Sequence, residues 1–388
     1  MKVFLKLKGT LELLGRILVK ALLFPVPRDR HLVVFGAWAG TRFDDNARVL
    51  FEHCLATRPD CRCVWHTRSR SVRDQLDRMG LPVALVDSFR GWWNICRAKY
   101  IIHTDSPRDY GWPLFSGGAT IVNLWHGVGP KRFGKDISKT PTAFGHFLEK
   151  AERALVRQYY VSTSDAITER YLRVFETDKS HVLCLGQARN DVFFTPHENP
   201  LRTRFPGRRI VAYLPTFRED GNRPMPMDLD RLLDLPALEA VCQQYGLAFL
   251  VKFHQWTPGH LSAGFEHIIE LKDNSLHVQM LLDAADILIT DYSSCFVDHL
   301  LLDRPQILFA YDLDHYMTHE RNLYGDFRAD ATGRLCEDNA ALLDELEKLA
   351  QGKDAYAVQR HRIRDFYYNP ENQCSVAAKQ VEKILSLR

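Results

Sequence analysis

Two histidines follow directly after short apolar runs, one in each half of the chain. His126 follows residues 122–125, and His254 follows residues 249–253. An imidazole titrates near neutral pH, so it can accept a proton from an attacking hydroxyl or stabilise charge on a phosphate. We therefore expect these two histidines to be the catalytic residues of a group-transfer reaction.

Cations lie close to both histidines in the sequence. Gly127 is followed by Lys131 and Lys135 in a glycine-rich stretch, and Lys252 precedes the second histidine by two positions. A spacing of two places side chains on the same face of a strand. Glycines let a backbone approach a ligand closely, and the ammonium groups would suit an anionic donor or a phosphorylated acceptor. An ordinary basic loop without a ligand is the alternative interpretation of the first stretch.

A pattern in the second half predicts a site for a diphosphate. Residues 285–305 are typical of a strand, a sharp turn and a helix, with Asp291 where the strand ends. Ser293 or Ser294 would cap the helix, and the unpaired N–H groups of its first turn, together with the helix dipole, attract anions. An ordinary helix cap is the alternative. Asp298, one helical turn further on, would either meet a ribose hydroxyl or face solvent.

Arg218 follows the first predicted strand of the second half. Its planar guanidinium suits phosphate oxygens, to which it can donate paired hydrogen bonds. An exposed arginine without a ligand is the alternative. Because no Asp-x-Asp pair stands at a predicted strand end in a context that is convincing for a metal, we expect cations and backbone amides to meet the charge of the donor, without a bound metal or other cofactor.

Length and composition limit the classes of protein. A chain of 388 residues exceeds what one compact core usually holds, and 46% hydrophobic residues with 26% charged ones indicate a globular protein of two domains. A net charge of +3 is too small to indicate a nucleic-acid partner. The nine cysteines are an odd number without a Cys-x-x-Cys pair, which argues against a disulfide framework and a structural zinc and favours a reducing cytoplasm.

Short, continuous apolar runs alternate with helical patterns along most of the chain. Continuous runs are typical of parallel strands covered on both faces, and their alternation with helices indicates βαβ units. Strands are predicted at residues 31–37, 62–66, 82–86, 100–103, 120–125, 159–162, 181–185, 209–214, 248–253, 267–271, 287–290, 306–310 and 333–336. We predict an α/β fold of two Rossmann-like domains facing a central cleft, the GT-B arrangement. The pattern alone also fits periplasmic binding proteins and some epimerases.

A turn-rich stretch at residues 196–200 divides the two predicted domains. The N-terminal domain is expected at residues 28–198 and the C-terminal domain at 199–372, with a last helix at 373–388 that returns to the first domain. In open parallel sheets, ligands bind beyond the carboxyl ends of the strands. Two such sheets that face each other would direct both histidines into one cleft.

Residues 1–27 predict an amphipathic helix. Apolar residues recur at helical spacing, lysines and arginines are interleaved along the segment, and two prolines end it. The charges exclude a membrane-spanning helix, and the lack of a small-residue cleavage site after an apolar block argues against a signal peptide. We expect this helix to lie on an anionic membrane surface. A helix packed on its own domain is the alternative.

Six ordered blocks of residues resemble the CDP-glycerol glycerophosphotransferases of teichoic acid synthesis. They are Trp125-His126-Gly127 with Lys131 and Gly134-Lys135-Asp136, Ser164-Asp165, Gly186-x-x-Arg189-Asn190-Asp191, Pro215-Thr216-Phe217-Arg218, Lys252-x-His254, and Thr290-Asp291-Tyr292-Ser293-Ser294 with Asp298. The resemblance extends from about residue 35 to residue 336 and includes residues 309–313. This chain differs from the usual pattern of the family at Val128, Ala188 and Gln255.

The resemblance implies a peripheral enzyme at the cytoplasmic face of the cell membrane. Such an enzyme moves glycerol phosphate, or a related polyol phosphate, from CDP-glycerol or another CDP-polyol to a hydroxyl of a polyprenyl-diphosphate-linked glycan or of the growing polymer, and releases CMP. It would act in the synthesis of teichoic acid or a capsule-like polymer. The N-terminal domain would bind the acceptor and the C-terminal domain the CDP-linked donor. The chain length resembles that of members with a single catalytic unit, including those that add the first glycerol phosphate.

In that family, histidines that match His126 and His254 are important for activity, and residues that match Arg218, Ser293 and Ser294 lie at the donor phosphates. We hypothesise an in-line displacement at the β-phosphorus of CDP-glycerol, in which His126 accepts the proton of the acceptor hydroxyl. Arg218, His254 and the helix that begins near Ser294 would stabilise charge on the diphosphate, and the roles of the two histidines could be exchanged. The other candidate substrate-binding residues are Gly127, Lys131, Lys135, Arg189, Lys252, Asp291 and Asp298.

Three other functions fit parts of the pattern. A GT-B glycosyltransferase with a nucleotide-sugar donor would share the fold and the diphosphate site. A non-hydrolysing nucleotide-sugar epimerase would share them as well but would need no membrane helix. A non-catalytic scaffold at the membrane would not require cations and histidines at the ends of predicted strands.

Overall fold

The computed structural model describes residues 15, 17–19, 21–23, 25–137, 157–220, 223–254, 257–272, 276–320 and 322–387. These residues fall into two compact units. The first unit takes the described residues within Met1–His126, Ser138–Asp191 and Glu371–Arg388, and the second takes those within Gly127–Ile137 and Val192–Pro370. The chain therefore leaves the first unit and returns to it twice.

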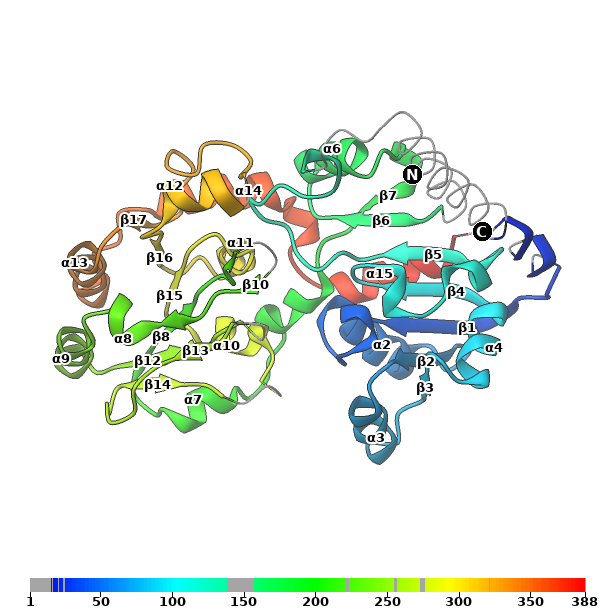
Figure 1. The fold of residues 1–388 in the computed structure, drawn as a ribbon, viewed down its shortest axis with the longest axis horizontal. Helices are drawn as coiled ribbons and strands as arrows, with labels where there is room; N and C mark the ends of the chain where they lie inside the picture. The colour runs from blue at the N-terminus through cyan, green and yellow to red at the C-terminus, as the bar shows by residue number, and fades with distance from the viewer. Residues whose placement is uncertain are drawn as a thin grey trace, which may run out of the picture. The chain divides into compact units, whose positions relative to one another are not determined.

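The first unit is built on a parallel sheet of seven strands in the order β3-β2-β1-β4-β5-β6-β7 (Figure 1). The strands are β1 (Asp29–Gly36), β2 (Arg62–Thr67), β3 (Val83–Leu85), β4 (Ala98–His103), β5 (Thr120–Asn123), β6 (Tyr159–Ser162) and β7 (Val182–Cys184). The α-helices with described bounds are α2 (Asp45–Thr57), α3 (Arg70–Arg78), α4 (Phe89–Arg97), α6 (Asp165–Val174) and α15 (Val376–Leu385).

The second unit has a parallel sheet of six strands in the order β14-β12-β8-β15-β16-β17. The strands are β8 (Arg209–Leu214), β12 (Leu247–Val251), β14 (Ile268–Glu270), β15 (Ile287–Thr290), β16 (Gln306–Phe309) and β17 (Arg334–Cys336). Two short pairs lie outside this sheet, β9 (Glu219–Asp220) with β10 (Arg223–Pro224) and β11 (Met227–Asp228) with β13 (Gly259–His260). The helices are α7 (Pro200–Arg204), α8 (Leu229–Leu232), α9 (Leu235–Tyr245), α10 (Val278–Ala284), α11 (Cys295–His299), α12 (Leu313–His315), α13 (Asn339–Ala350) and α14 (Ala357–Tyr367).

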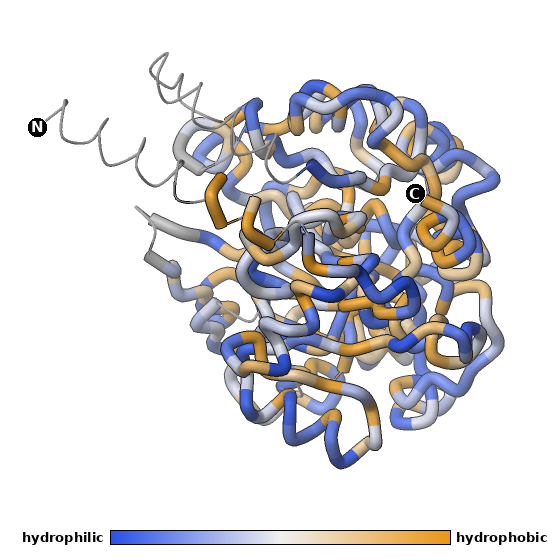
Figure 2. The backbone as a smooth tube through the Cα atoms, turned by 90° about the vertical axis from the view of Figure 1, so that its right-hand side faces the viewer, coloured by the Kyte–Doolittle hydropathy of each residue, from blue (hydrophilic) through white to orange (hydrophobic). Residues whose placement is uncertain are grey.

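Each of the predicted strands is present, and every described pairing within the two large sheets is parallel, so the predicted α/β fold class is confirmed. Figure 2 shows hydrophobic stretches of backbone alternating with hydrophilic ones, as expected when buried strands are joined by surface helices and loops. The strand predicted at 120–125 is shorter than expected, because Trp125 has a φ of 57° and cannot continue an extended conformation.

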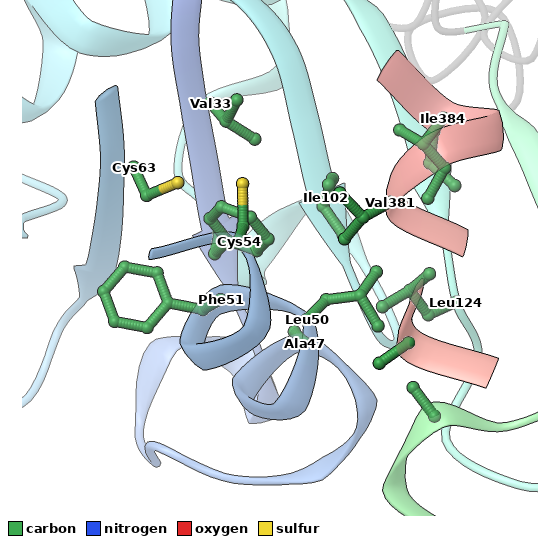
Figure 3. Packing of buried hydrophobic residues seen from close by; sticks show 14 of the residues in the cluster. Val33, Ala47, Leu50, Phe51, Cys54, Cys63, Ile102, Leu124, Val381 and Ile384 are labelled. Carbon is green, nitrogen blue, oxygen red and sulfur yellow. The ribbon is translucent and has the colours of Figure 1, made fainter. Parts of the chain in front are cut away.

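One core of the first unit joins its sheet to the last helix of the chain. Phe51 of α2 packs edge-on against Phe35 of β1, with ring centroids 5.4 Å apart. Figure 3 shows Val381 and Ile384 of α15 beside this core, to which both belong. The segment after residue 370 thus returns to the first unit through burial of an apolar helix face, the arrangement that favours docking of an amphipathic helix.

The carboxylate of Asp191 fixes the start of α15. Its two oxygens accept hydrogen bonds from the backbone N–H groups of Val376 and Ala377, each at 2.8 Å. The first N–H groups of a helix have no partner within the helix, so this side chain supplies the cap. Burial raises the pKa of Asp191 above its usual value, although the two N–H donors oppose this shift.

The observed division of the chain differs from the expected domain boundaries in one stretch that matters for the site. Residues 127–137 were expected in the N-terminal domain, but the structure groups them with the second unit. The change between units further along the chain falls between Asp191 and Val192, before the turn-rich stretch that was expected to form the linker.

Most of the predicted amphipathic helix at residues 1–27 lies outside the described residues. Residues 17–19 and 21–23 are helical, and Ile17, Leu18 and Leu22 are exposed. Within the described part of the chain, we find no helix with the length and apolar character needed to cross a membrane.

We predict that Asp191→Ala destabilises the protein by about 2 kcal/mol, because two buried N–H groups at the start of α15 lose a charged acceptor. Urea unfolding monitored by circular dichroism would measure this loss. Asp344→Ala is the matched control, since Asp344 forms exposed ion pairs and should change stability by at most about 1 kcal/mol. Equal losses in the two variants would contradict the capping role.

Candidate active-site residues in the two units

His126 leaves the end of β5 on an unusual backbone. Trp125 and Gly127 have φ angles of 57° and 129°, a region that non-glycine residues seldom adopt. The backbone N–H of Trp125 donates to Oδ1 of Asn123 at 2.8 Å, and its carbonyl accepts from Nδ2 of Asn46 at 2.9 Å. Strained backbone held in this way is common at functional sites.

A buried polar network lies behind this turn. Asn46 also donates to Oε1 of Gln187 at 2.7 Å and accepts from the backbone N–H of Arg189 at 3.0 Å. Nη1 of Arg189 donates to the carbonyl of His126 at 2.7 Å and to Oδ1 of Asp45 at 3.0 Å. Burial raises the pKa of Asp45, although the guanidinium opposes the shift. Arg189, which the sequence predicts as a substrate-binding residue, is buried and holds the backbone of the histidine.

The imidazole of His126 is 41% exposed. Its centroid lies 4.5 Å from the ring of Trp125 and 6.4 Å from that of Trp38. Nδ1 is buried and has no hydrogen-bond partner, and the closest carboxylate oxygen, Oδ1 of Asp105, is 3.7 Å away, beyond hydrogen-bond distance. When Nδ1 of a neutral imidazole carries the proton, Nε2 carries the lone pair that can accept one.

Asp45, Asn46 and Asp105 were not among the site residues predicted from the sequence. Asp105 stands two residues after β4, which pairs with β5, so the rule that predicted His126 at a strand end applies to Asp105 as well. Asp45 and Asn46 begin α2, and the pattern of the sequence gives no signal that they contact a loop so far along the chain.

In the second unit, Arg218 lies at the centre of a buried ion-pair cluster. The residue is 5% exposed. Its guanidinium donates to Asp312 from Nε and Nη2, at 2.7 and 3.0 Å, and to Oδ2 of Asp291 from Nη2 at 2.8 Å. Nη1 donates to the carbonyl of Thr216 at 2.9 Å. Burial alone would lower the pKa of Arg218, but Asp291 and Asp312 outweigh it and raise that pKa.

Aromatic rings enclose the same cluster. The guanidinium carbon of Arg218 lies 5.0 Å from the ring centroid of Tyr292 and 5.1 Å from that of Tyr316, and these two rings stack at 4.0 Å. The hydroxyl of Tyr292 donates to Oδ1 of Asp312 at 2.9 Å. As predicted from the sequence, Arg218 lies just after the end of a strand, β8. Its guanidinium does not point into solvent, because its hydrogen bonds join the ends of β8 and β15 to the segment after β16.

The turn after β15 differs in part from the predicted diphosphate site. The helix α11 begins after Ser294, whose side chain forms no capping bond, and Oγ of Ser293 accepts from the backbone N–H of Cys295 at 3.4 Å. Asp298 does not face solvent. It is buried, and its Oδ1 accepts a hydrogen bond of 2.8 Å from the hydroxyl of Tyr368.

The basic loop of residues 127–137 packs on this second unit. Lys131 forms an antiparallel bridge with Leu323, and the backbone N–H of Tyr324 donates to the carbonyl of Pro130 at 2.6 Å. Nζ of Lys131 lies 5.8 Å from the ring centroid of Tyr316. A Cβ on Gly129 would lie 3.0 Å from Cβ of Ser294, so the loop covers the turn after β15 closely. The sequence assigned Lys131 and Lys135 to the acceptor domain, and the structure places both in the second unit.

His254 and Lys252 follow β12, which ends at Val251. The backbone N–H of Lys252 donates to the carbonyl of Tyr213 at 3.1 Å, and the ring of His254 lies 5.6 Å from that of Phe217. Lys252 and His254 were expected on one face of this strand. Because the strand ends before both residues, strand geometry alone does not place their side chains on the same side. Gln255, where the chain departs from the family pattern, lies outside the described residues.

One group of described side chains has the composition and spacing of a metal site. Asp228 of β11, Asp230 of α8 and His260 of β13 offer ligand atoms within 4.8 Å of one another. None of them belongs to the predicted site, and Asp230 already accepts hydrogen bonds from the backbone and side chain of Ser262.

We predict that Arg218→Ala costs about 3–5 kcal/mol of stability, because it leaves Asp291 and Asp312 buried without their cation. Chemical denaturation would measure the loss. Arg328→Ala, which removes an exposed partner of Glu337, should cost at most about 1 kcal/mol. A stable Arg218→Ala protein that binds donor weakly would indicate instead that the guanidinium serves the ligand.

Comparisons with known proteins agree with the motifs. Residues 18–385 match the family model described as CDP-Glycerol:Poly(glycerophosphate) glycerophosphotransferase. The chain is 26% identical to the teichoic acid glycerol-phosphate transferase of Staphylococcus aureus (86% of this chain, 87% of that protein). It is 25% identical to the teichoic acid ribitol-phosphate primase of Bacillus spizizenii, over 84% of each chain.

The fold also matches a solved structure, that of the wall teichoic acid polymerase TagF. The TM-score is 0.76 at 21% identity, over 98% of each chain. The family match spans nearly the whole chain and includes both histidine segments, so the predicted family is confirmed. The chain belongs to the CDP-glycerol:poly(glycerophosphate) glycerophosphotransferase family of polyol-phosphate transferases.

Proposed function

We propose that this protein transfers glycerol phosphate, or a related polyol phosphate, from its CDP-linked donor to a hydroxyl of a lipid-linked glycan or growing polymer. CMP is the other product, and the polymer is a teichoic acid or a capsule-like chain. The observation that carries the proposal is the family match over residues 18–385, which includes both histidine segments. Relatives that act on glycerol phosphate and on ribitol phosphate support the reaction and leave two candidate polyols.

The reaction is a displacement at the β-phosphorus of the donor. The acceptor oxygen forms a bond to this phosphorus, the bond from the phosphorus to the oxygen of CMP breaks, and CMP leaves with that electron pair. His126 accepts the proton of the acceptor hydroxyl through Nε2, while Asp105 holds Nδ1. The exposed imidazole supports the role of His126, and the support for Asp105 is that its carboxylate lies near Nδ1, at 3.7 Å.

The second unit binds the diphosphate of the donor. Lys131, Lys135, Lys252 and His254 supply the positive charge, and Arg218 acts as a positioning residue that keeps the ends of β8 and β15 in place. The hydrogen bonds of its guanidinium to Asp291, Asp312 and Thr216 support this division of roles.

A lipid-linked acceptor requires a protein that works at a membrane. We propose that it is peripheral to the cytoplasmic face, where the amphipathic segment at residues 1–27 lies on anionic lipid. The exposed side chains of Ile17, Leu18 and Leu22 support this placement.

His126→Ala should reduce CMP release by about 10²–10⁴-fold, the usual contribution of a general base, with little change in CDP-glycerol binding. CMP release should be measured with CDP-glycerol, CDP-ribitol and a nucleotide sugar, each with a lipid-linked acceptor. His361→Ala is the matched control, because this histidine is similarly exposed and pairs on the surface with Asp303. Normal turnover by His126→Ala would exclude the assigned base, and release from the nucleotide sugar alone would favour a glycosyltransferase.

Asp105→Asn should lower kcat by about 10-fold or more and leave KM for the donor unchanged, since the substitution affects the orientation of the base and not the donor. Steady-state kinetics at saturating donor would separate the two constants. Asp87→Asn removes another exposed carboxylate of the same unit and should change neither. An increase of KM without a change in kcat would place Asp105 at the donor instead.

A further inference from the structure

Helix α4 of the first unit is partly buried. Gly91, Asn94 and Ile95 lie on its packed face at helical spacing, and Cys96 near its end is buried as well. A Cβ on Gly91 would lie 2.2 Å from the carbonyl oxygen of Leu85, so the helix approaches the backbone too closely for any other residue. This close contact fixes the rotation of the helix and therefore fixes which side chains face outwards.

Large aromatic side chains occupy the outward face. Phe89 is 78% exposed, Trp93 49% and Trp92 42%, and the rings of Phe89 and Trp93 stack in parallel at 6.4 Å. The ring of Trp92 lies 6.4 Å from Phe115, which belongs to a short 3-10 helix, η3 (Pro113–Ser116), packed against α4. Trp112, directly before η3, is 50% exposed. We call Phe89, Trp92, Trp93 and Trp112 the aromatic surface.

Single exposed apolar residues are ordinary, but four large aromatic side chains on two adjoining elements are not. Tryptophan prefers the boundary between water and lipid, because its ring is apolar and its N–H can still bond to water or a headgroup. The three tryptophans of this surface therefore fit a lipid headgroup region.

The charges around the aromatic surface are positive. Arg90 is exposed on α4, and the guanidinium carbon of Arg97 lies 5.7 Å from the ring centroid of Trp93. The helix contains no acidic residue, and Asp87, just before it, already pairs with Arg68 at 3.3 Å. Cations beside interfacial aromatic rings favour anionic headgroups.

The chain itself connects this surface to the N-terminal segment. Nη1 of Arg28 donates to the carbonyls of Ile95 and Ala98, at 2.7 and 3.4 Å, and a Cβ on Gly118 would lie 3.5 Å from Nε of Arg28. The residues just after the predicted amphipathic helix are therefore fixed at the end of α4. Figure 1 shows α4 and the start of β1 at the same end of the first sheet.

We infer that the aromatic surface is a second membrane contact, which inserts into an anionic bilayer next to the N-terminal segment and sets the orientation of the first unit on the membrane. This inference rests on the proposed function, because a lipid-linked acceptor confines the enzyme to a membrane. It goes further by assigning the contact to a rigid part of the fold, so the distance of His126 from the lipid is set by the first unit itself and not by a tether.

Quenching of tryptophan fluorescence by brominated lipids separates this contact from the N-terminal segment, because no tryptophan precedes Trp38 in the sequence. Vesicles that contain brominated phosphatidylglycerol should quench the full-length protein. The triple variant Trp92→Phe, Trp93→Phe and Trp112→Phe should bind the same vesicles and lose most of the quenching. Binding without quenching of the unmodified protein would overturn the inference.

A sedimentation experiment tests the contribution to affinity. Phe89→Ser combined with Trp93→Ser should weaken binding to phosphatidylglycerol vesicles by about 10-fold or more, since two aromatic side chains leave the lipid. Phe366→Ser, at an aromatic residue of similar exposure in the second unit, is the matched control and should bind normally. Equal vesicle binding by the unmodified protein, the double variant and Phe366→Ser would overturn the inference. The inference would also be overturned if the unmodified protein formed a concentration-dependent dimer and the double variant did not, because the aromatic surface would then be a contact between two copies of the protein.

CMP release from CDP-glycerol with a detergent-solubilised acceptor tests the proposed function separately. The double variant should retain the rate of the unmodified protein in detergent and lose activity only on vesicles. Release in detergent without vesicle quenching would retain the function and reject the membrane contact. Quenching on vesicles without any CMP release would retain the membrane contact and reject the proposed function.

Discussion

The direction in which His126 leaves β5 depends on two residues whose backbone has positive φ angles, a conformation that residues with a Cβ seldom adopt. Trp125 and Asp45 have φ angles of 57° and 66°, each of which costs about 1–3 kcal/mol for a residue with a Cβ. Hydrogen bonds hold both residues in these conformations. Asn46 donates to the carbonyl of Trp125, and Arg189 donates to the carboxylate of Asp45. The start of α2 and the segment after β7 therefore hold a turn that neither the strand nor the loop would adopt alone.

The second unit uses a buried ion cluster for the same purpose. Removing Arg218, Asp291 and Asp312 from water is expensive, and such clusters contribute little net stability compared with apolar packing. The main contribution of this cluster is to geometry. The N–H donors of a guanidinium point in fixed directions, so they hold the carboxylates of Asp291 and Asp312 in defined positions. The ends of β8 and β15 and the segment after β16 are joined by this one side chain, as the turn of the first unit is joined by Arg189.

The sequence predicted the strands better than it predicted which residues contact one another. Continuous apolar runs predict buried parallel strands because burial on both faces depends on the run alone, and each predicted strand is present. The loop at 127–137 was assigned to the other domain because its position depends on main-chain pairing with residues 322–324, which no local pattern encodes. Arg218 was predicted at a strand end but not as buried, since its partner Asp312 follows a different strand. Asp45 and Asn46 gave no signal, because their importance lies in contacts made only after folding.

The placement of that loop changes the electrostatics of the second unit. One guanidinium and the carboxylates of Asp291 and Asp312 leave the ion cluster with a net negative charge, which would repel a diphosphate. The ammonium of Lys131, 5.8 Å from the ring of Tyr316 that also covers Arg218, offsets this charge. The loop thus supplies positive charge beside a cluster whose own net charge is negative. Because Lys131 is half-exposed and Arg218 is enclosed, the lysine is the cation of this pair that remains accessible from solvent.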